Sequence, residues 1–69
     1  MTKFAHSFEI SKRRYHEVDD MILWCKNNIG RGGYIPHEYN SWEIVGIFGN
    51  STFRFKNEKD SVLFALRWL

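Results

Sequence analysis

The chain has 69 residues, of which 43% are hydrophobic and 17% aromatic, and ten Lys and Arg against eight Asp and Glu give a net charge of +2. This length predicts a single domain over residues 1–69, and the aromatic content excludes a disordered tail. So small a charge excess does not by itself argue for nucleic-acid binding. The one cysteine excludes an intrachain disulfide and favours the cytoplasm, and no apolar run approaches the ~18 residues of a membrane span.

The first segment alternates apolar and polar side chains, which predicts a strand over residues 4–10. Its inward positions are expected to be Phe4, His6, Phe8 and Ile10. Ser11 can then cap a helix that ends at Gly30. The apolar stripe of this helix recurs at three- and four-residue spacing and comprises Tyr15, Val18, Ile22, Cys25 and Ile29. Leu23 and Trp24 fall outside the stripe, so we expect Trp24 to be only half-buried.

Residues 30–41 contain three glycines and the one proline without a clear period, which predicts a loop. Arg31, Tyr34, His37 and Tyr39 are residue types that stack on bases or exchange protons. Loop aromatics more often fold back over a small core, however. We therefore expect Tyr34 and Tyr39 to cover the core.

Two further strands are predicted over residues 42–48 and 51–56, joined by a two-residue turn at Gly49–Asn50. This turn would place Gly46 opposite Phe53, Ile44 opposite Phe55 and Glu43 opposite Lys56. All aromatic residues of the hairpin then lie on its apolar face.

The last segment predicts a helix that Asn57 can cap, with Glu58 and Asp60 in its first turn. Apolar residues occupy more than one stripe of this helix. The residues expected to face the sheet are Val62, Ala65, Leu66 and Leu69. Phe64 and Trp68 would then form a second ridge, which either completes the core against the first helix or anchors a partner.

The element order is β-α-β-β-α, which predicts an α+β two-layer sandwich. A right-handed crossover gives a three-stranded antiparallel or mixed sheet of strand order 2-3-1, with both helices on one face. This arrangement is like a ferredoxin-type fold without its last strand. The first strand would form an exposed sheet edge, which favours pairing with another copy.

Basic residues open the first helix, where positive charge opposes the helix macrodipole. A bound anion would relieve this conflict. The candidate contacts for a nucleic acid or phosphoanion are Ser11, Lys12, Arg13, Arg14 and Arg31. The alternative is a solvated helix end that Glu17 partly neutralises.

No pattern points to catalysis, a metal or a cofactor. His6, His16, His37 and Cys25 lack the paired spacing of zinc ligands, and Cys25 lies on an apolar stripe, as expected of a core thiol. The carboxylates carry no sign of burial that would tune them for proton transfer. The sequence therefore predicts a protein that is not an enzyme and binds neither metal nor cofactor.

Three stretches carry a resemblance to known proteins: Trp24-Cys25, Asn27 to Gly30, and the ending from Phe53 to Trp68. In them the chain resembles small uncharacterised proteins of tailed bacteriophages, particularly those of marine and cyanobacterial hosts. The resemblance implies the cytoplasm of an infected bacterium as the setting. It also implies action by binding larger host or phage machinery, without naming a target.

Surplus apolar surface makes a small protein-interaction or regulatory module the leading prediction, acting as a homodimer or bound to a larger protein. The predicted interface comprises Phe64, Trp68, Trp24 and Leu23 together with the edge of the first strand. Nucleic-acid or phosphoanion binding at the basic helix start is the alternative function.

Overall fold

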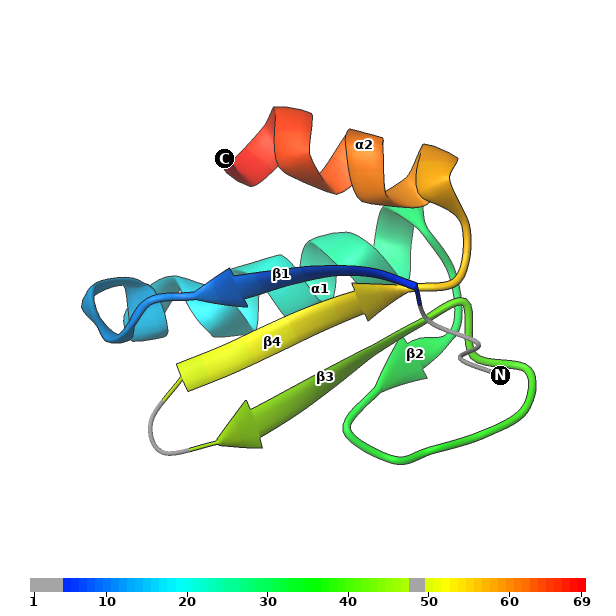
Figure 1. The fold of residues 1–69 in the computed structure, drawn as a ribbon, viewed down its shortest axis with the longest axis horizontal. Coiled ribbons are helices and arrows are strands. Elements are labelled where there is room, and N and C mark those ends of the chain that lie inside the picture. Colours follow the sequence, from blue (N-terminus) through cyan, green and yellow to red (C-terminus); the bar gives the residue numbers. More distant parts are fainter. Residues whose placement is uncertain (1–4, 48–49) are drawn as a thin grey trace.

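The fold is an α+β domain with two α-helices and a four-stranded mixed sheet (Figure 1). It is known from a computed structural model that describes residues 5–47 and 50–69, without the side chains of Lys12, Arg13 and Ile47. Its elements in chain order are strand β1 (His6–Ile10), 3-10 helix η1 (Lys12–Glu17), helix α1 (Val18–Asn28), strands β2 (Gly32–Gly33), β3 (Trp42–Ile47) and β4 (Asn50–Phe55), and helix α2 (Glu58–Trp68).

The sheet has the order β1-β4-β3-β2, so the predicted three-stranded sheet of order 2-3-1 is incomplete. β4 pairs antiparallel with both β1 and β3, and β1 lies at an edge. The added strand, β2, pairs parallel with β3 through Gly32 opposite Trp42 and Gly33 opposite Glu43. Two glycines have no side-chain alternation, so no sequence pattern separates this strand from the loop around it.

The β3–β4 hairpin differs from its predicted register by two residues. Ile44, rather than Gly46, lies opposite Phe53, and Trp42 lies opposite Phe55. Glu43 consequently faces Arg54 instead of Lys56, and their side chains form an ion pair of 2.8 Å. Because the shift is even, every side chain keeps its predicted face. The predicted turn residue Gly49, like Phe4 and Phe48, lies outside the described residues.

The first helical segment is divided, whereas the sequence predicted one helix from Ser11. Arg14 has φ −109° and ψ 15° within η1, and α-helical geometry is established only from Val18. The Ser11 side chain makes no capping hydrogen bond. The predicted end at Gly30 is confirmed, because Gly30 has φ +133° and its amide donates to the Cys25 carbonyl at 3.0 Å.

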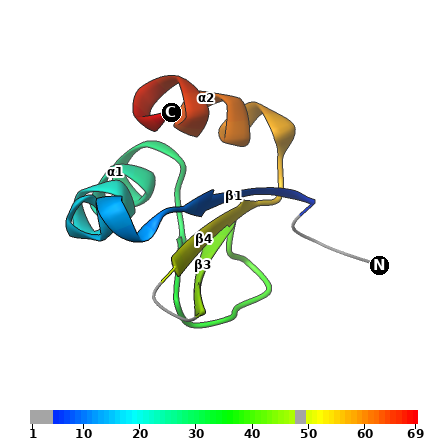
Figure 2. The same cartoon turned by 60° about the vertical axis from the view of Figure 1, so that its left-hand side comes forward.

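Both helices pack against one face of the sheet (Figure 2). The core between them is formed by Ile10, Val18, Met21, Cys25, Trp42, Ile44, Phe53, Phe55 and Phe64. Along β1 the exposed residues alternate with half-buried and buried ones, as predicted from the sequence. The core therefore draws on β1, β3, β4 and both helices.

Candidate interaction surface

Helix α2 presents the opposite face to the one predicted. Phe64 is fully buried, whereas Leu66 is 81% exposed and Leu69 is 62% exposed. The prediction that Val62, Leu66 and Leu69 face the sheet is therefore wrong, whereas Ala65 is half-buried. Of the two alternatives for the ridge of Phe64 and Trp68, Phe64 completes the core against α1, so its predicted place in a partner interface is wrong. In this fold Phe64 is inaccessible to a partner.

The reason for this orientation is the aromatic environment that Phe64 enters. Its ring centroid lies 4.9 Å from that of Phe53, 5.1 Å from Phe55 and 5.8 Å from Phe8. Trp24 of α1 approaches it edge-on at 6.1 Å. An aromatic ring buries more apolar surface than a leucine, and such ring pairs add about 0.5–1.5 kcal/mol beyond that burial. Turning α2 the other way would forfeit these contacts.

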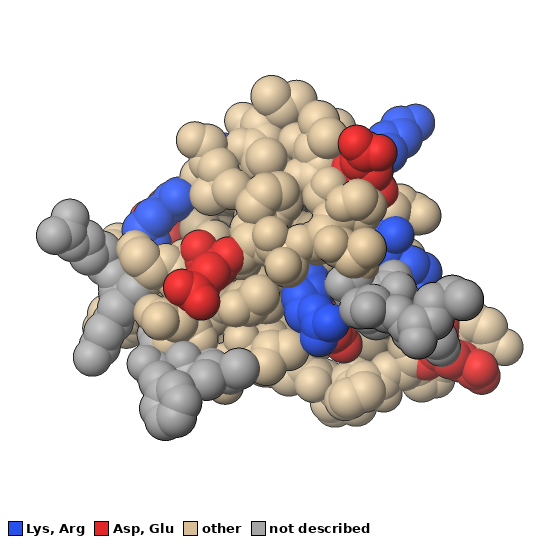
Figure 3. Space-filling model, viewed as in Figure 1, with Lys and Arg blue, Asp and Glu red and all other residues tan. Residues whose placement is uncertain are grey.

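The outward side of α2 carries an unburied aliphatic surface, which we call the α2 aliphatic face. It comprises Val62, Leu63, Leu66 and Leu69, exposed by 49, 43, 81 and 62%. Their spacing of three and four residues places them on one side of the helix. In Figure 3 the surface over most of α2 is free of charged side chains, which gather at the helix's N-terminal end. Unburied apolar surface thus does remain in the last helix, but it is aliphatic rather than aromatic.

Three of the four predicted interface residues meet in a hollow between α1 and α2. Leu23, Trp24 and Trp68 line this α1–α2 hollow of about 280 Å³, together with Asp20, Asn27, Asn28 and Arg67. Leu23 is 58% exposed, whereas Trp24 and Trp68 are half-buried against the core. Arg67 stacks over the Trp68 ring, with its Cζ 4.0 Å from the ring centroid. The hollow thus brings Leu23 and Trp24 of α1 next to Trp68 of α2.

Of the residues predicted to contact an anion, Arg14 is paired within the chain and Arg31 lies beyond the other end of α1. Arg14 forms two hydrogen bonds with the Glu17 carboxylate, at 2.9 and 3.1 Å. Hydrogen bonding from Arg14 lowers the pKa of Glu17, which stays ionised as the partner of this arginine. Arg31 follows the far end of α1, about 28 Å from Ser11 along the path of η1 and α1. The side chains of Lys12 and Arg13 lie outside the described part of the structure.

The loop aromatics also depart from the prediction. Tyr34 is 60% exposed and Tyr39 is 70% exposed, so neither covers the core. Trp42 and Phe64 fill the core instead. The two tyrosines are consequently part of the accessible surface.

Metal-ligating and nucleophilic residues are dispersed. Within residues 5–47 and 50–69, no group of three or more His, Cys, Asp or Glu side chains is placed to hold a metal ion. Cys25 is fully buried in the core, as its place on the apolar stripe predicted, and burial raises the pKa of its thiol to about 12.

The buried thiol gives a testable dependence of stability on pH. The unfolded thiol loses its proton near pH 8.5, whereas the folded thiol retains it to about pH 12. The contribution of the buried thiol to the free energy of unfolding is therefore fully present below pH ~8.5. Above that pH it declines, by at most about 1.4 kcal/mol per pH unit. Urea unfolding from pH 7.5 to 10.5 should show a steeper loss for the native chain than for Cys25→Ala. Parallel curves for the two proteins would contradict this expectation.

No helix in the described part of the chain is long and apolar enough to cross a membrane. Comparison of the chain with protein-family models, with curated proteins and with solved structures gives no match.

Proposed function

We propose that this chain is a non-enzymatic protein-interaction module that forms a homodimer through the α2 aliphatic face. The observation that carries the proposal is the exposure of four aliphatic side chains on one side of one helix. Contiguous apolar surface of this kind marks interaction sites on small soluble proteins. Burying it against a second copy would also add to the small core that 69 residues can build.

The charges of α2 favour a second copy over an unrelated partner. Glu58 and Asp60 lie in its first turn and Arg67 in its last turn. In a two-fold dimer with antiparallel α2 helices, the acidic turn of each copy approaches Arg67 of the other. The antiparallel helix dipoles also attract each other. The same surface thus carries both halves of a complementary charge pattern around an apolar centre.

Two further surfaces extend this proposal. β1 is an edge strand and can pair with a strand of another chain, although Ser7 and Glu9 project from its exposed face. Leu23 of the α1–α2 hollow lies beside α2 and would enlarge the contact. The resemblance to tailed-phage proteins adds the proposed setting, a regulator in the cytoplasm of an infected bacterium.

The central test places a charge in the proposed interface. Sedimentation of the native chain is expected to give twice the monomer mass of 8.3 kDa at high micromolar concentration. Leu66→Asp should weaken dimerisation at least about tenfold, because it buries an unpaired carboxylate. The matched control is Ile35→Asp in the loop, since Ile35 is also 81% exposed. This control should leave the dimer intact.

A charge exchange tests the antiparallel arrangement. Glu58→Lys should weaken the dimer because the new lysine faces Arg67 of the other copy, and adding Arg67→Glu should restore it. A native chain that stays monomeric at millimolar concentration would overturn the proposed homodimer. So would a dimer that Leu66→Asp and Ile35→Asp weaken equally.

A further inference from the structure

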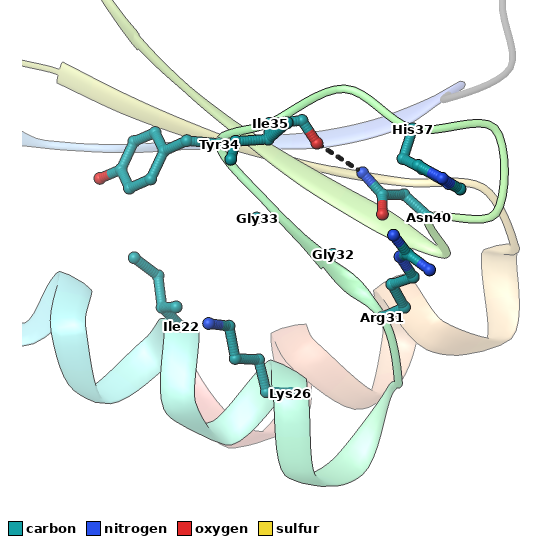
Figure 4. A pocket seen from close by; sticks show the side chains of 9 residues that line it. All are labelled: Ile22, Lys26, Arg31, Gly32, Gly33, Tyr34, Ile35, His37 and Asn40. Atoms are coloured by element: carbon teal, nitrogen blue, oxygen red, sulfur yellow. Dashed lines mark hydrogen bonds between the residues drawn. The ribbon is translucent and has the colours of Figure 1, made fainter.

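A second hollow lies away from the α2 aliphatic face, between α1 and the loop that follows it. This α1–loop pocket has a volume of about 370 Å³ and is lined by Ile22, Lys26, Arg31, Gly32, Gly33, Tyr34, Ile35, His37 and Asn40 (Figure 4). Its volume is at the lower end of the range of about 300–1,000 Å³ usual for small-molecule sites. A ligand of modest size would fill it.

The charged side chains of the pocket are all of one sign. Lys26 comes from the last turn of α1 and Arg31 from the start of the loop, and none of the nine lining residues is acidic. Neither cation forms an ion pair with any described carboxylate. In Figure 4 the Lys26 ammonium reaches toward Ile22, below Gly33, whereas Arg31 points toward Asn40 and His37, so the Gly32–Gly33 segment runs between the two cations. Two unpaired cations around one hollow favour an anionic ligand.

The backbone at the floor of the pocket is open to close approach. β2 is the last strand of the sheet, so only one of its edges is paired. Gly33 has φ +149°, and a Cβ built there would meet no atom within 4 Å. A ligand can therefore reach the main chain at this position without meeting a side chain, as phosphate groups do at glycine-rich segments.

The loop that closes the pocket is held by internal hydrogen bonds. Asn40 is 2% exposed, and its side-chain amide donates to the Ile35 carbonyl at 2.9 Å. The Trp42 indole donates to the Gly30 carbonyl at 2.9 Å, and the Ser41 amide donates to the Arg31 carbonyl at 2.8 Å. Because these bonds all lie within the protein, they hold the loop in place around the pocket.

The end of the pocket away from Arg31 carries apolar and aromatic side chains beside the Lys26 ammonium. Ile22 and Tyr34 lie together at that end in Figure 4. Tyr34 is 60% exposed and Ile35 is 81% exposed, so both offer uncovered apolar surface. A planar base stacks favourably on a tyrosine ring, worth about 1–3 kcal/mol. The pocket thus combines two cations with an aromatic side chain at one end.

We propose that the α1–loop pocket binds a nucleoside monophosphate unit, with its phosphate at Lys26 and Arg31 and its base against Tyr34. The unit is supplied either as a free nucleotide or as part of a single-stranded RNA. The proposal is independent of dimerisation, because it shares no residue with the α2 aliphatic face. It also differs from the anion site predicted at the first helix start, from which only Arg31 is retained.

The test is an NMR titration of the ¹⁵N-labelled chain with AMP at low ionic strength. We expect shifts centred on the amides of Gly32, Gly33 and Tyr34. Lys26→Gln and Arg31→Gln should each weaken AMP binding about tenfold, since each removes a charge-assisted contact. The charge-matched control is Lys59→Gln on α2, an exposed residue outside the pocket, which should bind as the native chain does.

Partial ligands separate the contribution of the phosphate from that of the base. Ribose 5-phosphate should bind about tenfold more weakly than AMP, and Tyr34→Ala should remove this difference. Oligoadenylate that binds far more tightly than AMP, through the same three side chains, would identify RNA as the source. Similar affinity for both ligands would identify the free nucleotide.

Three results would overturn the proposal. The first is AMP-induced shifts that avoid the pocket amides, and the second is equal weakening by Lys59→Gln and Lys26→Gln. The third is inorganic phosphate binding as tightly as AMP, because a bare anion does not use Tyr34.

Discussion

Replacing Phe64 with alanine is expected to unfold most of the protein at room temperature. The Phe64 ring is fully buried and contacts the rings of Phe8, Trp24, Phe53 and Phe55. Removing a buried phenylalanine side chain costs about 3–5 kcal/mol, which equals the whole stability expected of a domain this small. Urea unfolding followed by tryptophan fluorescence measures the loss.

Two variants make the Phe64 prediction specific. Leu66→Ala, on the same helix but 81% exposed, should change the stability of the monomer by less than about 0.5 kcal/mol. Phe64→Leu keeps part of the contact and should remain folded with an intermediate loss. A Leu66→Ala monomer destabilised as strongly as Phe64→Ala would mean that α2 packs with the face predicted from the sequence.

Gly32→Ala is expected to have the second-largest effect. A Cβ at Gly32 would collide with the Trp42 carbonyl oxygen and with its indole ring. Trp42 is fully buried, and its indole donates a hydrogen bond to the Gly30 carbonyl, so neither group can move freely. Relieving the collision should separate β2 from β3 and cost about 1–3 kcal/mol.

Gly46→Ala is the matched control for this substitution. Gly46 also lies in a strand, but a Cβ there would meet no atom within 4 Å. The change should be neutral or stabilise by about 0.4–1 kcal/mol, because alanine restricts the unfolded chain. Thermal unfolding of both variants tests the pair. Equal stability of the two would show that β2 does not pack against Trp42 as described.

The positions of β1, β3 and β4 were predictable because the sheet has one covered face. Phe53 and Phe55 alternate with Arg54, and this period of two survives any even change of register. The register itself was not predictable from the pattern, because a shift by two residues gives the same alternation. The register is set at the turn of the β3–β4 hairpin, where Ile47 pairs with Asn50.

The face of α2 was predicted wrongly for a related reason. Apolar residues lie on both sides of this helix, so periodicity allows two orientations that differ by about half a turn. The choice depends on the space that Phe8, Phe53, Phe55 and Trp24 leave open, and these residues come from three other elements. Of the predicted interface, Leu23, Trp24 and Trp68 were brought together, whereas Phe64 entered the core.

The sequence by itself determined the α+β class, the strand-to-helix change at Asn57 and the helix end at Gly30. These features rest on local periods and on glycine's access to positive φ. Only the tertiary structure decided the fourth strand, the division of the first helix, the outward face of α2 and the pocket around Lys26 and Arg31. Each of these four features depends on how side chains from distant parts of the sequence pack together, and such packing produces no periodic pattern in the sequence.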